Sequence, residues 1–125
     1  MKEAIFTKKA PDVIGPYSQA IIHGNMIYVS GQLPVLPASG EIISEDIIEQ
    51  TKQSLENLQA ILKTVGVDLS AVVKTTVFIQ NMSDFSFVNE VYSTYFKGTY
   101  PARTCVEVAK LPKNALVEIE AIAVR

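Results

Sequence analysis

EDIIEQTKQSLENLQAILKTV, residues Glu45–Val65, is the stretch that decides the fold predicted from this sequence. Residues that can face a core recur in it at the spacing of an amphipathic helix. They are Ile47, Ile48, Thr51, Leu55, Leu58, Leu62 and Val65. Glu45 and Asp46 fall in the expected first turn, where the helix dipole favours negative charge, and Gly66 stands where helices commonly end. We therefore predict a long helix with one buried face.

Strand signals lie on both sides of this helix. Before it, Glu3–Thr7 is a short candidate strand, and the apolar runs Ala20–Ile22 and Met26–Val29 flank Gly24-Asn25, a dipeptide typical of hairpins. After it, Val72–Gln80 (VVKTTVFIQ) is rich in β-branched residues. In this strand one face is expected to hold Val73, Thr75, Val77 and Ile79.

A second helix and two further strands complete the chain. Ser83 or Asp84 is the expected N-cap of the helix, and Gly98 its expected end. The residues predicted on its buried face are Phe85, Val88, Tyr92 and Tyr95. The last two strands are predicted over Ala102–Val108 and Leu116–Val124.

The order of strands and helices predicts a single α/β domain spanning residues 1–125. Its mixed sheet of about six strands has two helices on one face, which leaves the other face uncovered. The chain is 48% hydrophobic and only 19% charged. A homo-oligomer that buries the uncovered face explains this composition, and an unusually rich core is the alternative.

Composition excludes several classes of protein. A formal net charge of −2, a pI of about 5.4 and scattered lysines do not suit nucleic-acid binding. With one cysteine, Cys105, and one histidine, His23, no intramolecular disulfide and no zinc site of Cys and His ligands is expected. No signal-peptide pattern or membrane-length apolar run is present. We expect a cytoplasmic protein without membrane contact.

Alternation along the last two strands supplies the candidate site residues. Arg103, Cys105 and Glu107 share one face of the first strand, and Glu118 and Glu120 share one face of the second. The strands are expected to be paired or nearly so, and their polar faces can then bring Arg103 within reach of a glutamate. A guanidinium binds a carboxylate bidentately. A purely structural ion pair is the alternative.

Three further positions allow both structural and functional interpretations. Cys105 can be a nucleophile, although a small buried residue is the simpler interpretation without a Cys–His motif. His23 beside the Gly-Asn turn is expected to be exposed and to have no role. Ser30-Gly31 and Gly15-Pro16-Tyr17 have turn chemistry. The functional interpretation aims the Gly31 N–H at a ligand carboxylate, with Tyr17 as a lid.

Motifs along nearly the whole chain carry a resemblance to a known family. They are Ile14–Ala20 (IGPYSQA), Val29–Pro34 (VSGQLP), Val73–Phe78 (VKTTVF), Phe87–Tyr92 (FVNEVY), Pro101–Val108 (PARTCVEV) and Leu111–Ala123. With these motifs the sequence resembles the RidA family, also called YjgF/YER057c/UK114. The resemblance implies a chorismate-mutase-like fold of the Bacillus type and a homotrimer with sites in the clefts between subunits.

The resemblance also implies an activity. Family members hydrolyse 2-iminobutanoate and 2-iminopropanoate to 2-oxo acids and ammonia, without a cofactor or metal, and so protect pyridoxal-phosphate enzymes. A non-catalytic regulatory protein that binds 2-oxo acids is the alternative. A ribonuclease activity, also attached to the family, is disfavoured by the acidic pI and the isolated His23.

Family roles are transferred residue by residue. Arg103 would clamp the substrate carboxylate with help from the Gly31 N–H, Glu118 would activate water, and the Cys105 main chain would contact the imine nitrogen or the water. The expected pocket lining is Tyr17, Ser30, Asn89 and Phe85. The segment 95–100 looks slightly shorter than in many relatives, which is expected to affect the edge of the pocket.

Overall fold

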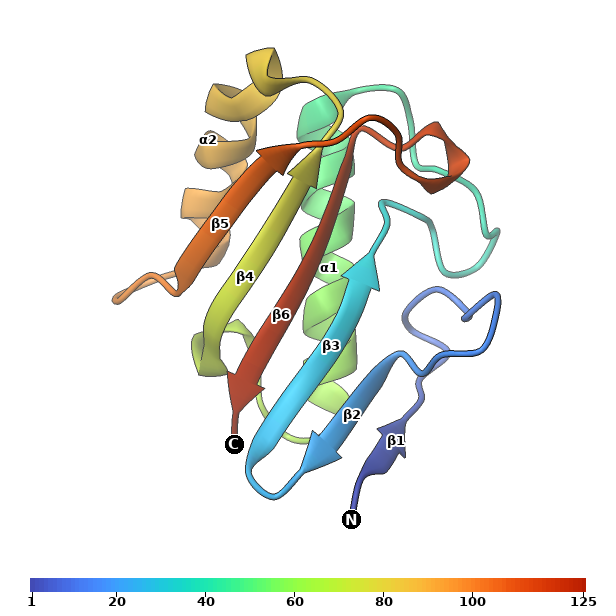
Figure 1. Cartoon of the computed structure of the whole chain (residues 1–125), viewed down its shortest axis with the longest axis vertical. Helices are drawn as coiled ribbons and strands as arrows, with labels where there is room; N and C mark the ends of the chain where they lie inside the picture. The colour runs from blue at the N-terminus through green and yellow to red at the C-terminus, as the bar shows by residue number, and fades with distance from the viewer.

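The computed structural model describes all residues, 1–125, as one six-stranded mixed sheet with two helices. The elements in chain order are β1 (Glu3–Ile5), β2 (Ala20–His23), β3 (Met26–Gln32), α1 (Ile47–Thr64), β4 (Val72–Ile79), α2 (Phe85–Tyr95), β5 (Ala102–Glu107) and β6 (Val117–Val124). The strand order is β1-β2-β3-β6-β4-β5, and only β4 and β5 are parallel. Figure 1 shows the sheet in front with α1 behind it. The predicted fold class is confirmed.

Helix α1 begins and ends at the signals in its sequence. Asp46 is the N-cap, and its carboxylate accepts a hydrogen bond from the Glu49 N–H at 2.9 Å. At the other end Gly66 has a φ of 83°, and its N–H donates to the Lys63 carbonyl while the Val67 N–H donates to the Leu62 carbonyl. This is the Schellman arrangement, which requires a left-handed residue after the cap. Asp46 therefore precedes the first turn rather than lying in it.

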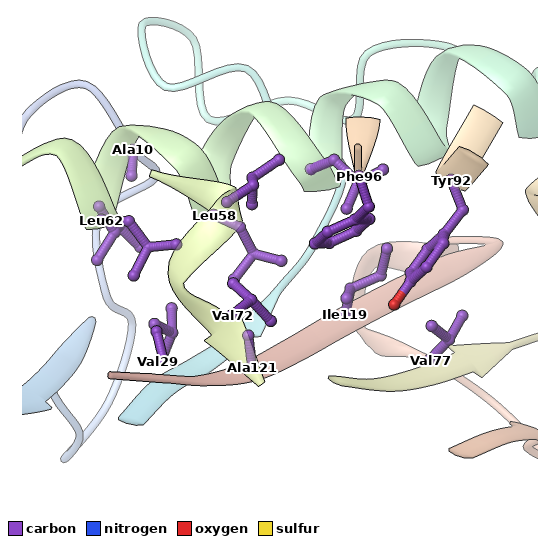
Figure 2. Close-up of a cluster of buried hydrophobic side chains, with 14 of the residues drawn as sticks. Ala10, Val29, Leu58, Leu62, Val72, Val77, Tyr92, Phe96, Ile119 and Ala121 are labelled. Carbon is purple, nitrogen blue, oxygen red and sulfur yellow. The ribbon is translucent and has the colours of Figure 1, made fainter. Parts of the chain in front are cut away.

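The core lies between α1, α2 and the sheet. Leu58 and Leu62 are fully buried on the sheet side of α1, and Figure 2 shows them facing Val29, Val72 and Ala121 of the strands. Burying one such leucine contributes about 1.5–3 kcal/mol. The expected helix face is confirmed, and packing against this core fixes α1 on one side of the sheet.

One strand face was predicted wrongly. Val72, not Val73, is buried with Thr75, Val77 and Ile79, and Val73 is 47% exposed. The pairing of β4 with β6 shifts register between Val72 and Lys74. This shift is a β-bulge, whose extra residue swaps the buried and exposed faces for the residues before it. A prediction that assumes strict two-residue alternation along the strand therefore assigns these residues to the wrong face.

The end of α2 also differs from the prediction. The helix ends at Tyr95, three residues before Gly98, because Phe96 adopts extended backbone angles and is buried. The Phe96 ring packs on Tyr92 with the centroids 4.5 Å apart. Burial of this ring therefore ends the helix before the glycine. Neither α1 nor α2 is long and apolar enough to cross a membrane.

No helix covers the second face of the sheet, which is turned toward the viewer in Figure 1. Apolar side chains are partly or largely exposed there, including Tyr28 at 46% and Val106 at 40%. Phe78 and Ile122 add half-buried apolar surface on the same side. Several apolar side chains thus lie together on the face that no helix covers.

Candidate active site

A cavity of about 1060 Å³ opens between β3, β6 and the loops around residues 11–17 and 33–40. Among its lining residues are Tyr17, Ser30, Gly31, Glu118 and Glu120, and we call it the Glu118 cavity. The Ser30 hydroxyl donates to the Ser18 carbonyl at 2.6 Å, which ties β3 to the loop that carries Tyr17. Four of these residues were predicted for the site, and all four line the same cavity: Tyr17, Ser30, Gly31 and Glu118.

Gly31 lies directly against the Glu118 carboxylate. A Cβ placed on Gly31 would lie 2.5 Å from Oε2 and 2.9 Å from Cδ of Glu118. The approach arises where the pairing of β3 with β6 shifts register between Val29 and Gln32. Glycine is needed at position 31 because any side chain would displace the carboxylate.

The Glu118 carboxyl is half-buried at the wall of this cavity. Burial raises its pKa above the ordinary 4.5, and the neighbouring Glu120 carboxylate raises that pKa further. The other charged residues lining the cavity are Asp12 and Lys113. A carboxyl whose pKa lies above the ordinary range is suited to accept and return protons during catalysis.

Arg103 lies in a separate cluster beside α2. Its Nη1 donates to Asn89 Oδ1 at 2.8 Å, and its Cζ lies 4.9 Å from the ring centroid of Tyr92 and 5.4 Å from that of Phe85. The Tyr92 hydroxyl is 2.8 Å from Thr75 Oγ1. We call Phe85, Asn89, Tyr92 and Arg103 the Arg103 cluster. One hydrogen bond and two rings hold the guanidinium, which leaves its other N–H groups for a ligand.

Tyr92 is the member of this cluster that sequence reasoning did not assign to the site. Phe85, Asn89 and Tyr92 recur at helical spacing, which was the available signal. A second cavity, of about 450 Å³, lies beside Arg103, and Tyr100 is one of its lining residues. The end of the segment 95–100 therefore borders the arginine.

Cys105 lies two residues along β5 from Arg103, on the same face of the strand. Burial raises the pKa of its thiol, and the Arg103 charge partly offsets this. A raised pKa is the opposite of what a thiolate nucleophile needs. His23 ends β2 at the hairpin turn and is exposed. No group of three His, Cys, Asp or Glu side chains is placed to hold a metal ion.

Arg103 and Glu118 of one chain lie on opposite faces of the sheet. Strand β4 separates β5 from β6, pairing Thr75 with Arg103 and Phe78 with Glu118. Thr75 and Phe78 are three residues apart, so their side chains point to opposite faces. Of the two expectations for the last two strands, paired or nearly so, the second is confirmed, because a single strand lies between them. The expectation that Arg103 reaches a glutamate is wrong within one chain, as an active pair or a structural one.

The predicted residues therefore form two half-sites. Tyr17, Ser30, Gly31 and Glu118 lie at the Glu118 cavity, whereas Phe85, Asn89 and Arg103 form a cluster on the helix side with Cys105 nearby. Fold and site together define the class: a small α/β protein that presents a half-buried carboxyl on the open face of its sheet and a guanidinium on the other face.

Comparison with known proteins identifies the family. The chain belongs to the family described as endoribonuclease L-PSP, which is the YjgF/RidA family, and its family model matches residues 7–125. A protein of Escherichia coli named 2-iminobutanoate/2-iminopropanoate deaminase is 49% identical over 100% of this chain and 99% of its own. A RutC family protein of Pyrococcus horikoshii is 54% identical over 98% of both chains.

A solved structure shares the whole fold. The crystal structure of Escherichia coli TdcF with bound serine superposes with a TM-score of 0.94 and is 48% identical over 98% of both chains. The predicted family membership is thus confirmed over the full chain.

Proposed function

We propose that this protein hydrolyses short 2-imino acids, such as 2-iminobutanoate and 2-iminopropanoate, to 2-oxo acids and ammonia. The observation that carries the proposal is the state of Glu118. Its carboxyl is half-buried, packs on Gly31 and has a pKa that burial and the Glu120 charge raise above the ordinary value. Full-length relatives with the deaminase name, among them the Escherichia coli protein, support the substrate class.

The working site is shared between subunits of a homotrimer. One subunit supplies Arg103 with its cluster, and its neighbour supplies Glu118 with Gly31, Ser30 and Tyr17. Two features support this arrangement: the half-sites lie on opposite faces of one sheet, and the face that carries Glu118 also carries exposed apolar side chains such as Tyr28. Assembly would bury this surface and complete the site at once.

Hydrolysis follows from these positions. Arg103 and the Gly31 N–H hold the substrate carboxylate, which sets the imine carbon before a water molecule at Glu118. Glu118 takes a proton as the water oxygen bonds to the carbon of the protonated imine. Glu118 returns the proton to the nitrogen of the resulting amino alcohol, and as the C–N bond breaks Glu118 takes the proton of the new hydroxyl group, so that the carbonyl of the 2-oxo acid forms. The departing ammonia then carries this proton away as ammonium, which restores the Glu118 carboxylate. The protonated imine is already electrophilic, so the reaction needs no cofactor.

The remaining site residues orient these groups. The Cys105 main chain contacts the imine nitrogen or the water, and Tyr17 and Ser30 line the pocket. Asn89 and Phe85 hold the Arg103 guanidinium. Because both arginine and base are fixed before substrate arrives, little reorganisation is left for the chemical step.

A coupled assay tests the activity. Threonine and a threonine dehydratase supply 2-iminobutanoate, and the appearance of 2-oxobutanoate is followed where spontaneous hydrolysis is slow. Added protein should raise the rate. An unchanged rate would remove the deaminase proposal, and calorimetric binding of 2-oxobutanoate without hydrolysis would favour the regulatory alternative.

Subunit mixing tests the shared site. Arg103→Ala and Glu118→Ala should each inactivate the protein when present in every subunit. Mixed by unfolding and refolding at equal amounts, they should regain about one quarter of wild-type activity, because about one interface in four then joins both intact half-sites. A mixture as inactive as its parents would contradict a site that uses two subunits.

We also place the protein in the cytoplasm, where Cys105 stays a thiol. The family description includes ribonuclease activity, but the net charge of −2 does not suit RNA binding.

A further inference from the structure

Helix α1 carries two amide side chains that are almost wholly buried. Gln50 is 2% exposed and Asn57 is 1% exposed, on the face that packs against the sheet. Burying an amide is costly unless its donors and acceptors are paired. Both amides are paired with backbone groups of distant segments, so each links the helix to another part of the chain.

Gln50 holds the segment that leads into β6. Its Oε1 accepts a hydrogen bond from the Leu116 N–H at 2.8 Å, and its Nε2 donates to the Ser44 carbonyl at 2.7 Å. Leu116 precedes Glu118 by two residues. Gln50 therefore fixes the backbone immediately before the carboxyl of the Glu118 cavity.

Asn57 holds the segment that follows β3. Its Nδ2 donates to the carbonyls of Leu33 and Val35, both at 3.0 Å, and its Oδ1 accepts from Gln53 at 2.9 Å. Leu33 follows Gly31 by two residues. Asn57 therefore fixes the backbone immediately after the glycine that the Glu118 carboxylate rests on.

We propose that Gln50 and Asn57 are positioning residues that set the contact between Gly31 and Glu118. Both side chains belong to the same helix. Gln50 holds the segment that leads into the strand of Glu118, and Asn57 holds the segment that leaves the strand of Gly31. The proposal rests on the proposed deaminase function and assigns a role in it to side chains that touch no substrate. The contact leaves no room for a side chain at position 31, since a Cβ added to Gly31 would lie 2.5 Å from Glu118 Oε2.

The two amides should affect different kinetic constants. Gln50 governs Glu118, the proposed base, so its loss should lower kcat with little change in KM. Asn57 governs Gly31, whose N–H is proposed to hold the substrate carboxylate, so its loss should mainly raise KM. A displacement of about 1 Å in a catalytic group can cost about 100-fold in rate, and we expect changes of about tenfold or more.

Gln50→Met and Asn57→Leu remove the polar contacts and keep a similar side-chain size. Ser54→Ala is the matched control, because Ser54 is buried on the same helix between them and its Oγ has no hydrogen-bond partner. The control should keep wild-type kcat and KM. If Asn57→Leu does not fold, Asn57→Ser, too short to reach both carbonyls, should raise KM less strongly.

The pH profile separates positioning from a mere loss of folded protein. Loosening the entry to β6 admits water to Glu118, so Gln50→Met should move the acid limb of kcat to lower pH. The charged side chains lining the same cavity are Glu120 on β6, Asp12 on the N-terminal loop and Lys113 on the loop before β6, all unchanged in this variant. A smaller folded fraction would lower kcat without moving the limb.

Hydrogen exchange gives a readout that does not need activity. Gln50→Met should speed amide exchange at residues 116–118, Asn57→Leu at residues 31–35, and Ser54→Ala at neither. If both variants lower kcat equally with unchanged KM, pH profile and local exchange, the positioning proposal is wrong. If the wild-type protein hydrolyses no imine, the deaminase function fails, while the exchange pattern still decides whether the amides fix these segments.

Discussion

Replacing Gly31 by alanine tests the contact at the centre of the site. The added Cβ would lie 2.5 Å from Glu118 Oε2, 2.9 Å from Cδ and 3.1 Å from Cγ, whereas ordinary contacts begin at 3.4 Å. The carboxylate oxygen must therefore retreat by about 0.9 Å. For a proposed base, a displacement of this size should lower kcat/KM by about 100-fold.

The cost to stability should be small by comparison. Gly31 does not have a positive φ, and the group in its way is the flexible end of a side chain. Gly24→Ala is the matched control, because Gly24 has a φ of 62° and a Cβ there would touch nothing. Its cost is backbone strain of about 1–2 kcal/mol.

The two variants should thus show opposite patterns. In the coupled imine assay Gly31→Ala should lose activity, and Gly24→Ala should keep it. In urea denaturation Gly24→Ala should lose more stability. Wild-type kcat/KM in a folded Gly31→Ala protein would refute the argument that Gly31 fixes the position of a catalytic Glu118.

Other predictions follow from the two half-sites. Arg103→Lys should lower kcat/KM by about ten- to a hundredfold, since it loses the second charge-assisted hydrogen bond to the carboxylate. Glu118→Gln should bind 2-oxobutanoate but turn over poorly, and wild-type turnover would remove Glu118 from the mechanism. Because burial raises the folded-state pKa of Glu118 above 4.5, ionising this carboxyl opposes folding. Glu118→Gln should therefore be the more stable protein in urea at pH 7, and this gain should disappear as the pH falls below 4.5. Glu120→Gln should move the acid limb of kcat to lower pH, because the Glu120 charge raises the pKa of Glu118. An unmoved limb would mean that another group titrates. Thr75→Val leaves the Tyr92 hydroxyl without its partner, and unfolding in urea should show a loss of about 1–3 kcal/mol.

Local patterns predicted most of the fold. Helical spacing located α1 to within two residues at its start and one at its end, and alternation along β6 assigned its buried and open faces correctly. These succeeded because helix and strand periods are properties of a short backbone segment. The bulge at Val73 and the early end of α2 at Tyr95 were missed, since each depends on packing against another element.

The candidate site shows the same division. By itself the sequence determined which side chains share a strand face: Arg103 with Cys105 on one strand, and Glu118 with Glu120 on another. Only the tertiary structure decided that β4 lies between these strands and turns Arg103 and Glu118 to opposite faces of the sheet. Alternation is set by neighbouring peptide units, whereas strand order is set by long-range packing of α1 and α2 on the sheet, which no local period records.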